Sequence, residues 1–268
     1  MSPLKKILPI KGFGIALKTL TLIPWPWNKN EDLATSLPWF PVIGLLLGLV
    51  LYGINLLYKL LPFDGWPEGI ALLMVATEIY LTRGLHLDGL ADWADSIGGF
   101  HQREKRLAIM KDTALGAFGA LALIVVLLAK WIAFERLVSS GSIIWALAIF
   151  ILSRDMMVEL ITTLPYARTG EGMAKTFTNM ASVKHRVASH IISFLFCLTF
   201  GPLGLVLLAL GWIQTWVFGM RCKHQFGGVT GDLLGTANEM VEVTLLIICA
   251  LPGKSILYFT GWAWVFYG

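Results

Sequence analysis

Asp88, Asp92 and Asp95 are the residues of this chain best suited to chemistry. They lie in the segment GLHLDGLADWAD at offsets i, i+4 and i+7, which place side chains on one face of a helix. A solvated acidic face usually interleaves lysines, yet Arg83 is the only lysine or arginine between positions 78 and 100. A divalent cation is the simplest neutraliser for these carboxylates, and ligation by oxygen atoms alone suits Mg²⁺ or Mn²⁺.

Such a cation indicates the class of substrate, because Mg²⁺ keeps waters and is commonly shared with substrate phosphates. The aspartates therefore predict a phosphorylated substrate, with an acidic helical turn that binds no metal as the alternative. Glu78 is interpreted as an additional metal ligand or hydrogen-bond acceptor, or else as a side chain that reaches the membrane interface. His86 is a candidate to orient a carboxylate, bind phosphate or act as an acid, with a purely structural role as the alternative.

A second motif, FGGVTGDLLGTANE, covers residues 226–239. Glycine-rich backbone ahead of a helix presents N–H groups to anions. Asp232 and Glu239 add a second acidic cluster, on a helix face that would otherwise meet lipid or a neighbouring helix. We expect substrate contacts from this motif through Thr230, Asp232, Asn238 and Glu239.

Three further places carry candidate substrate-binding residues. In MKDTALG, Lys111 is expected to meet phosphate oxygens or to act as a basic membrane anchor, and Asp112 is expected to cap a helix with a possible phosphate contact. In the fourth apolar run, Arg154 either pairs with other intramembrane charges or contacts phosphate. In PYARTGEG, Tyr166 and Arg168 offer ring stacking and bidentate phosphate binding, with a solvated connector as the alternative.

The composition indicates the elements that position these residues. The chain has 268 residues, is 56% hydrophobic and only 14% charged, and has a mean hydropathy of +0.72. These values exclude a soluble enzyme, a disordered chain and a disulfide-framed secreted domain, and the three scattered cysteines imply neither a disulfide nor a zinc site. A membrane-spanning helix needs about 20 mostly apolar residues. The apolar runs cover residues 38–61, 65–82, 115–134, 143–164, 187–201, 203–220 and 240–265.

These runs predict an all-α, polytopic integral membrane bundle of about seven transmembrane helices, formed by a single domain over residues 1–268. With the N-terminus in the cytoplasm, most of the 21 lysines and arginines fall in the cytoplasmic segments. This asymmetry explains the net charge of +4 without a nucleic-acid partner. Residues 1–30 are interpreted as a basic interfacial arm. The polar loops 83–114, 165–186 and 221–239 then emerge on one side, where they can build a single cytoplasm-facing site.

Four motifs in this order resemble the cobalamin synthase family, the adenosylcobinamide-GDP ribazoletransferases: GLHLDGLADxAD, IMKDTxLGAFG, LPYAR and GGVTGDxLGxANE. The resemblance spans nearly the whole chain. It implies a Mg²⁺-dependent inner-membrane enzyme that joins adenosylcobinamide-GDP to α-ribazole or its 5′-phosphate and releases GMP, the last step of nucleotide-loop assembly in cobalamin biosynthesis. It also implies a bacterial or archaeal source, and homo-oligomers or association with other late cobalamin-assembly enzymes are possible partners.

On the matching positions, the resemblance implies that Asp88, Asp92 and Asp95 form the acidic metal-binding group and that Asp232 and Glu239 form the second cluster. Breaking a phosphoanhydride with an alcohol requires neutralised diphosphate charge, an aligned hydroxyl and a base for its proton. Asp95 is the preferred base toward the ribazole 3′-hydroxyl, with Asp88 as the alternative.

Two other functions are consistent with parts of the pattern. A CDP-alcohol phosphotransferase of phospholipid synthesis uses the same metal chemistry but is expected to carry Asp-Gly-x-x-Ala-Arg, whereas Asp92 follows Ala91 here. An ion-coupled transporter would also place acids such as Glu78, Asp155 and Asp232 within spans. A transporter is expected to show inverted repeats, and the sequence shows no such internal repeat.

Overall fold

The computed structural model describes residues 10–26, 32–60, 62, 65–99 and 102–267, and this part of the chain is helical, with one isolated parallel β-bridge between Tyr166 and Val229. An all-α fold is therefore confirmed. The elements in chain order are α2 (Ile10–Leu20), η1 (Leu33–Trp39), α3 (Phe40–Lys59), α4 (Pro67–Thr82), α5 (Leu85–Ile97), α6 (Arg103–Ile109), α7 (Ala117–Ser140), α8 (Trp145–Thr163), α9 (Met173–Met180), α10 (Val183–Thr199), α11 (Pro202–Phe226), α12 (Gly231–Ala250), η2 (Gly253–Leu257) and α13 (Ala263–Tyr267).

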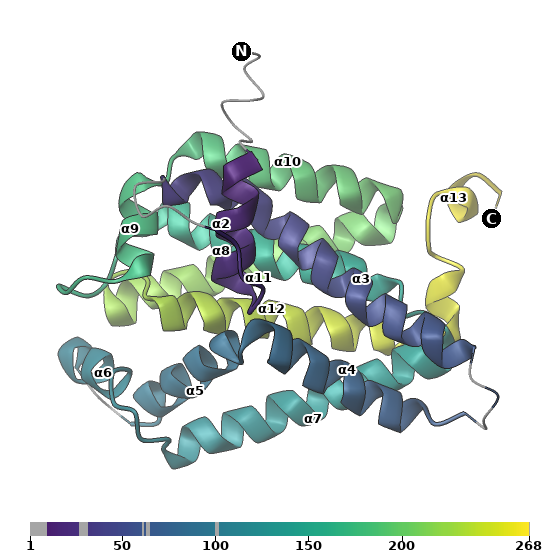
Figure 1. The fold of residues 1–268 in the computed structure, drawn as a ribbon, viewed down its shortest axis with the longest axis horizontal. Coiled ribbons are helices and arrows are strands. Elements are labelled where there is room, and N and C mark those ends of the chain that lie inside the picture. The colour runs from purple at the N-terminus through teal and green to yellow at the C-terminus, as the bar shows by residue number, and fades with distance from the viewer. Residues whose placement is uncertain (1–9, 27–31, 61, 63–64, 100–101, 268) are drawn as a thin grey trace.

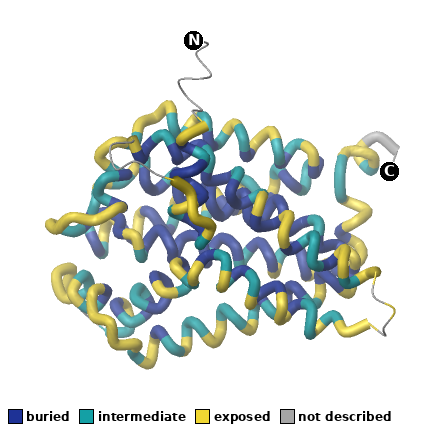
Figure 2. Tube along the Cα trace, in the orientation of Figure 1, coloured by how far each residue is buried: buried dark blue, intermediate teal, exposed yellow. Residues whose placement is uncertain are grey.

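Helices α8 and α12 form the interior of the bundle. Most side chains of both helices are buried, and α8 packs against α3, α10, α11 and α12. Helix α12 also packs against α5 and α7, so it lies between α8 and the group formed by α4, α5 and α7 (Figure 1). The peripheral helices carry exposed residues along their outward faces (Figure 2), and many of these residues are large and apolar, as expected for surfaces that meet lipid.

Four helical segments are long and apolar enough to cross a membrane, which supports a membrane protein. These segments are Leu33–Lys59, Ala117–Ser140, Pro202–Phe226 and Gly231–Ala250, and the pair α4 and α5 adds a fifth if it counts as one broken span. The predicted number of seven is not confirmed. Helix α10 has only 17 residues, and α8 carries Arg154, Asp155 and Glu159 within its 19.

The second predicted run ends in a sharp bend. Helices α4 and α5 meet at 90°, and the two residues between them adopt left-handed backbone conformations, Arg83 with φ 58° and Gly84 with φ 62°. Glycine adopts this conformation freely, whereas arginine does so at a cost. The bend turns α5 across the bundle, where it can pack against α12.

Two predicted boundaries are wrong by several residues, with consequences for the charged side chains. The third run was expected to end at residue 134, but α7 continues to Ser140, which moves Lys130 from a helix end to the middle of the helix. The last run was expected over 240–265, but α12 covers Gly231–Ala250 and ends just before Pro252. The residues that follow form only short helical turns.

The described part of the N-terminal arm packs on the bundle. Helix α2 buries one face, and a Cβ atom at Gly14 would lie 2.0 Å from the Trp25 ring, so only glycine permits this packing. Lys11 and Lys18 lie on the exposed face of the same helix. The predicted basic residues at positions 5, 6 and 29 lie outside the described residues.

Candidate active site

The close crossing of α5 and α12 brings two of the sequence motifs together. A Cβ atom at Gly89 would lie 2.6 Å from the backbone oxygen of Asp232, and one at Gly235 would lie 3.0 Å from Cα of His86. The hydroxyl of Thr236 donates a hydrogen bond to the backbone oxygen of Gly89, at 3.0 Å. Because glycines permit this approach, Asp88, the neighbour of Gly89, lies beside the first turn of α12.

The loops of the other two motifs close over this crossing. The backbone N–H of Val229 donates to the Pro165 oxygen and that of Ala167 donates to the Val229 oxygen, each at 2.9 Å. This pairing holds Arg168 in place, and its Nη2 donates to Oδ2 of Asp232 at 2.7 Å and to the backbone oxygen of Met110 at 3.0 Å. One arginine therefore joins the loops that contain residues 110, 168 and 232.

The carboxylates of α5 and α12 gather more negative charge than the neighbouring cation neutralises. Asp88, Asp95 and Asp232 are close enough to Asp92 to repel its carboxylate, while Arg168 attracts it. Within the described residues, the salt bridge to this group comes from Arg168, whose side chain is 15% exposed. Lys111 also lines a cavity together with Asp88 and Asp92, but the carboxylates still outnumber these two cations. Such an excess of carboxylate oxygens is a donor set that fits Mg²⁺ or Mn²⁺.

Two cavities meet at Asp88. A cavity of about 350 Å³, here called the polar cavity, is lined by charged and hydroxyl side chains from α5 and from the loop after α6, together with an equal number of apolar residues that include Leu123 of α7. A second cavity of about 160 Å³, here called the apolar cavity, is lined mostly by apolar residues such as Met, Phe, Leu and Ile. The polar residues of the first are Asp88, Asp92, Lys111, Asp112 and Thr113, and those of the second are Thr19, His86, Asp88 and Asp232.

Thr230 and Asp112 hold the backbone around these cavities. The Thr230 hydroxyl accepts from the N–H of Leu233 at 3.2 Å, which caps α12, and it also bonds to Oδ2 of Asp232 at 3.3 Å. Oδ1 of Asp112 accepts from the N–H of Ala114 at 3.1 Å. Thr230 thus caps α12, whereas Asp112 fixes only the turn before α7, because Asp95 accepts the N–H groups at the start of that helix. The predicted helix cap by Asp112 is therefore wrong, and its phosphate contact stays a prediction.

Asp95 differs from the other two aspartates of α5. Its Oδ2 accepts from the N–H of Gly116 and its Oδ1 accepts from the N–H of Gly119, each at 2.8 Å. N–H groups at the start of a helix have no carbonyl partner within that helix, and Asp95 accepts two of them at the start of α7. Asp95 therefore caps a helix other than its own. The structure therefore gives Asp95 a role that the sequence did not suggest, whereas Asp88 and Asp92 line the cavities.

Glu78, Glu239 and Arg154 lie in a separate, closed group, here called the ion cluster. Nζ of Lys130 is 2.6 Å from Glu78, 2.7 Å from Glu239 and 2.6 Å from Glu242, and all four side chains are less than 5% exposed. Glu242 also pairs with Arg154, whose guanidinium lies 4.6 Å from the centre of the Phe150 ring. The three carboxylates are close enough together to hold a metal ion, but the Lys130 ammonium already lies between them.

The geometry distinguishes between the roles that the sequence left open for three residues. Of the two site roles predicted for Glu78, the structure favours the hydrogen-bond acceptor over the metal ligand, because its carboxylate accepts from Nζ of Lys130. Glu239 was expected to form an acidic cluster with Asp232, yet it bonds to Lys130 as well. Arg154 lines neither cavity, which favours the structural alternative over phosphate binding.

Comparison with known proteins decides the family. A protein-family model described as Cobalamin-5-phosphate synthase matches residues 12–250. The chain belongs to this family. All four motifs that carry the resemblance lie within the matched range.

Several curated relatives support membership of the cobalamin-5-phosphate synthase family. The chain is 40% identical over 252 residues to the adenosylcobinamide-GDP ribazoletransferase of Chlorobium chlorochromatii (strain CaD3), covering 92% of this chain and 99% of that protein. It is 38% identical to the enzyme of the same name from Syntrophobacter fumaroxidans (strain DSM 10017 / MPOB), covering 89% of this chain and 97% of that protein. No solved structure matches the chain.

Three other predicted site residues of this family member have distinct positions. His86 is 2% exposed, and neither ring nitrogen has a hydrogen-bond partner among the described residues. Asn238 is buried and donates to Oε1 of Glu239 at 3.4 Å, so it belongs with the ion cluster. Tyr166 forms the β-bridge with Val229 and lines neither cavity.

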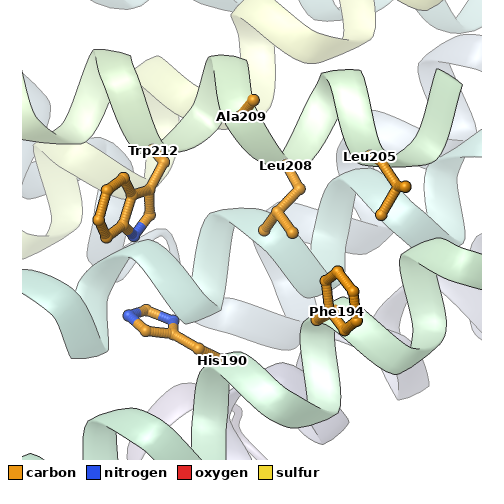
Figure 3. A pocket seen from close by; sticks show the side chains of 6 residues that line it. All are labelled: His190, Phe194, Leu205, Leu208, Ala209 and Trp212. Atoms are coloured by element: carbon orange, nitrogen blue, oxygen red, sulfur yellow. The ribbon is translucent and has the colours of Figure 1, made fainter. Parts of the chain in front are cut away.

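A further group of polar residues, which the sequence analysis did not assign to the site, joins α8 to α10. Nδ1 of His190 is 2.9 Å from Asp155, and its Nε2 is 2.9 Å from Glu159. Beside them lies a third, apolar cavity of about 400 Å³, here called the lateral cavity (Figure 3), which α10 and α11 line. Its residues are His190, Phe194, Leu205, Leu208, Ala209 and Trp212.

Lys130 is the central cation of the ion cluster, and the sequence motifs do not include it. The predicted apolar run over residues 115–134 puts Lys130 four residues from its end, close to the face of the membrane opposite the proposed site. The available signal was that apolar residues flank Lys130 on both sides, with Trp131, Ile132, Ala133 and Phe134 following it before Glu135, which makes Lys130 an intramembrane charge in need of a partner.

Proposed function

We propose that this chain transfers the phosphoryl-cobinamide group of adenosylcobinamide-GDP to α-ribazole or α-ribazole 5′-phosphate and releases GMP, as the final step of nucleotide-loop assembly in cobalamin biosynthesis. The family membership and the names of relatives that align over almost their whole length support this activity. The observation that carries the chemistry is the group of carboxylates around Arg168, which opens into two cavities at Asp88.

Asp88, Asp92 and Asp232 are the residues that would hold Mg²⁺, or Mn²⁺ in its place. Their carboxylates lie close together, and Arg168 alone does not balance them among the described residues. When bound, the ion supplies charge neutralisation for the diphosphate. Asp95 stays a candidate ligand from the sequence, but both of its oxygens already accept backbone N–H groups.

The transfer forms one bond and breaks another. The ribazole 3′-hydroxyl oxygen attacks the phosphorus that carries cobinamide, and the P–O bond of the anhydride breaks with its electron pair leaving on GMP. The hydroxyl proton passes to a carboxylate, for which we favour Asp88, because it lines both cavities and can therefore face both substrates. Lys111 lines the polar cavity, where its ammonium can meet phosphate oxygens.

We also propose that the site faces the cytoplasm of a cell whose inner membrane holds the protein. Lys111 and Arg168 belong to the loops 83–114 and 165–186, which the distribution of basic residues places inside. Both loops contribute to the site that contains Asp232. Association with other late cobalamin-assembly enzymes stays a prediction of the family resemblance.

Turnover in a reconstituted system tests the activity. The purified chain in proteoliposomes is incubated with adenosylcobinamide-GDP, α-ribazole and Mg²⁺, and GMP and the cobalamin product are measured by mass spectrometry. We expect equal amounts of both, and loss of both when EDTA removes the divalent cation. Folded protein that releases no GMP would contradict the activity, and CMP release from CDP-diacylglycerol with an alcohol would support a CDP-alcohol phosphotransferase instead.

A further inference from the structure

The apolar cavity has the properties of a binding site for a flat, apolar group. Side chains from α2, α3, α8 and α9 form its walls, and the rings of Phe40 and Phe177 meet edge to face with centroids 5.9 Å apart. Small-molecule sites are typically lined in this way, with a few polar groups that fix the orientation of the ligand. Its apolar lining residues include Leu20, Phe40, Met157, Ile161, Ala174 and Phe177.

Three of the four polar residues of this cavity come from α5 and α12, and the fourth, Thr19, comes from α2. The three are His86, Asp88 and Asp232. A buried imidazole normally forms hydrogen bonds, yet both nitrogens of His86 lack partners within the described part of the chain. The ring nitrogens of His86 are buried behind the cavity surface, on the side where the charges of Arg154, Glu242 and Lys130 act on the ring. A ligand group seated between the apolar walls and Asp88 would therefore meet this unpaired histidine once its ring turns toward the cavity.

We infer that the apolar cavity binds the base of the ribazole nucleoside, with its ribose toward Asp88 and with His86 as a hydrogen-bonding partner. This inference rests on the proposed function. The base of ribazole is a methylated benzimidazole, which has no exocyclic donor or acceptor, so walls of Met, Phe, Leu and Ile leave only its free ring nitrogen in need of a hydrogen-bond donor, and His86 is the candidate donor. The ribose hydroxyl then lies near the carboxylate proposed as the base.

The other substrate fits the polar cavity better than the apolar one. Guanine carries the O6 acceptor and the N2 donors, which would be costly to bury among apolar side chains. The polar cavity offers Lys111, Asp112 and Thr113, and its volume of about 350 Å³ is more than twice that of the apolar cavity. The two nucleotide parts would thus approach Asp88 from different cavities.

Filling the apolar cavity tests the inference by binding alone. Ala174 lines this cavity from α9, and Ala174→Leu narrows it without changing charge. We expect the Kd of α-ribazole, measured by titration calorimetry without the second substrate, to rise about tenfold, the effect of a pocket overpacked by a few methylenes. The Kd of adenosylcobinamide-GDP is expected to stay within about twofold of the unsubstituted chain.

A matched control fills another apolar cavity by the same substitution. Ala209 lines the lateral cavity (Figure 3), and Ala209→Leu is expected to leave both dissociation constants unchanged. His86→Phe keeps an aromatic ring but removes both nitrogens, and we expect it to weaken α-ribazole binding about tenfold as well. Thermal unfolding of each variant shows that the protein is folded.

Three outcomes separate this inference from the proposed function. Unchanged α-ribazole binding in folded Ala174→Leu and His86→Phe overturns the inference, while GMP release by the unsubstituted chain keeps the function. Weaker binding of adenosylcobinamide-GDP in place of α-ribazole reverses the assignment of the two cavities and also overturns it. Absence of GMP release from the unsubstituted chain overturns the function, whatever the variants bind.

Discussion

Helix α12 carries two kinds of carboxylate, and their surroundings differ. Asp232, in its first turn, is 23% exposed, lines a cavity and is paired with Arg168. Glu242, three turns further along, is fully buried and is paired with both Lys130 and Arg154. Both lie in an apolar helix, so sequence position alone does not distinguish them. Their surroundings distinguish them, because the Asp232 carboxylate faces a cavity whereas the Glu242 carboxylate is enclosed by protein side chains.

The balance of charge in the two regions explains their different roles. In the ion cluster, three glutamates face two cations at hydrogen-bond distance, and the group joins α4, α7, α8 and α12. Near Asp232, three further aspartates gather while Arg168 supplies the salt bridge seen within the described residues. Buried charge must be neutralised. The first region is neutralised mainly by the protein itself, whereas the second is left to be neutralised by a ligand.

Asp88→Asn is expected to have the largest effect and to separate the two regions by function. It removes the charge and the proton acceptor from the residue that both cavities share, so we expect kcat to fall about 10⁴-fold, or ~5.5 kcal/mol in the barrier. The melting temperature is expected to stay the same or to rise, because a repelling charge is removed. The measurement is GMP release in proteoliposomes together with a thermal melt.

The exposed Glu68→Gln is the matched control for loss of a carboxylate, and it is expected to leave both readouts unchanged. Full turnover by Asp88→Asn would place the reaction elsewhere in the molecule.

Lys130→Met is expected to have the next largest effect, on stability first. It leaves Glu78, Glu239 and Glu242 buried without their shared cation, which costs about 3–5 kcal/mol. We expect a much lower melting temperature and poor recovery of folded protein, measured by size-exclusion chromatography in detergent.

The control for Lys130→Met is Lys59→Met at the exposed end of α3, where a surface change is expected to cost less than about 0.5 kcal/mol. If Lys130→Met melted normally but lost turnover, the ion cluster would belong to the reacting site, and the contrast between the regions would fail.

Gly89→Ala tests the contact that joins the two aspartate motifs. The added Cβ would lie 2.6 Å from a backbone oxygen of α12, so the helices must move apart, at a cost of about 1–3 kcal/mol. We expect a lower melting temperature and lower kcat, because Asp88 and Asp232 no longer hold their relative positions.

In Gly53→Ala the new Cβ meets nothing within 4 Å, and the better helix propensity of alanine is expected to leave stability unchanged or improved. Equal melting temperatures for the two variants would show that the crossing of α5 and α12 is looser than the structure indicates.

Much of the site was predictable because it follows from local pattern. The offsets of Asp88 and Asp92 predict one helix face, and both side chains line the polar cavity. The loops that contain Lys111 and Arg168 were expected on the same side as Asp232, and Arg168 bonds directly to Asp232. Local spacing and the asymmetry of basic residues carry this information.

The partners of the buried charges were not predictable in the same way. Glu239 lies on the same face of α12 as Asp232, but its partner Lys130 lies more than 100 residues away along the chain. The bend at Arg83 and Gly84 was missed as well, because an arginine in a left-handed conformation leaves no pattern in the sequence. Pairings between distant helices depend on the packing of the whole bundle.

Asp95→Asn has the smallest expected effect. It tests whether this aspartate takes part in the reaction or only caps α7. The sequence favours it as the catalytic base, whereas the structure uses both of its oxygens to accept N–H groups from Gly116 and Gly119. An asparagine can accept only one of these bonds and would turn its amide toward the other donor, which costs about 1 kcal/mol, or ~2–4 °C in melting temperature. If Asp95 holds α7 in place, kcat should fall less than about tenfold, far less than in Asp88→Asn. A drop in turnover as large as that of Asp88→Asn, at an unchanged melting temperature, would instead return Asp95 to the reacting carboxylates.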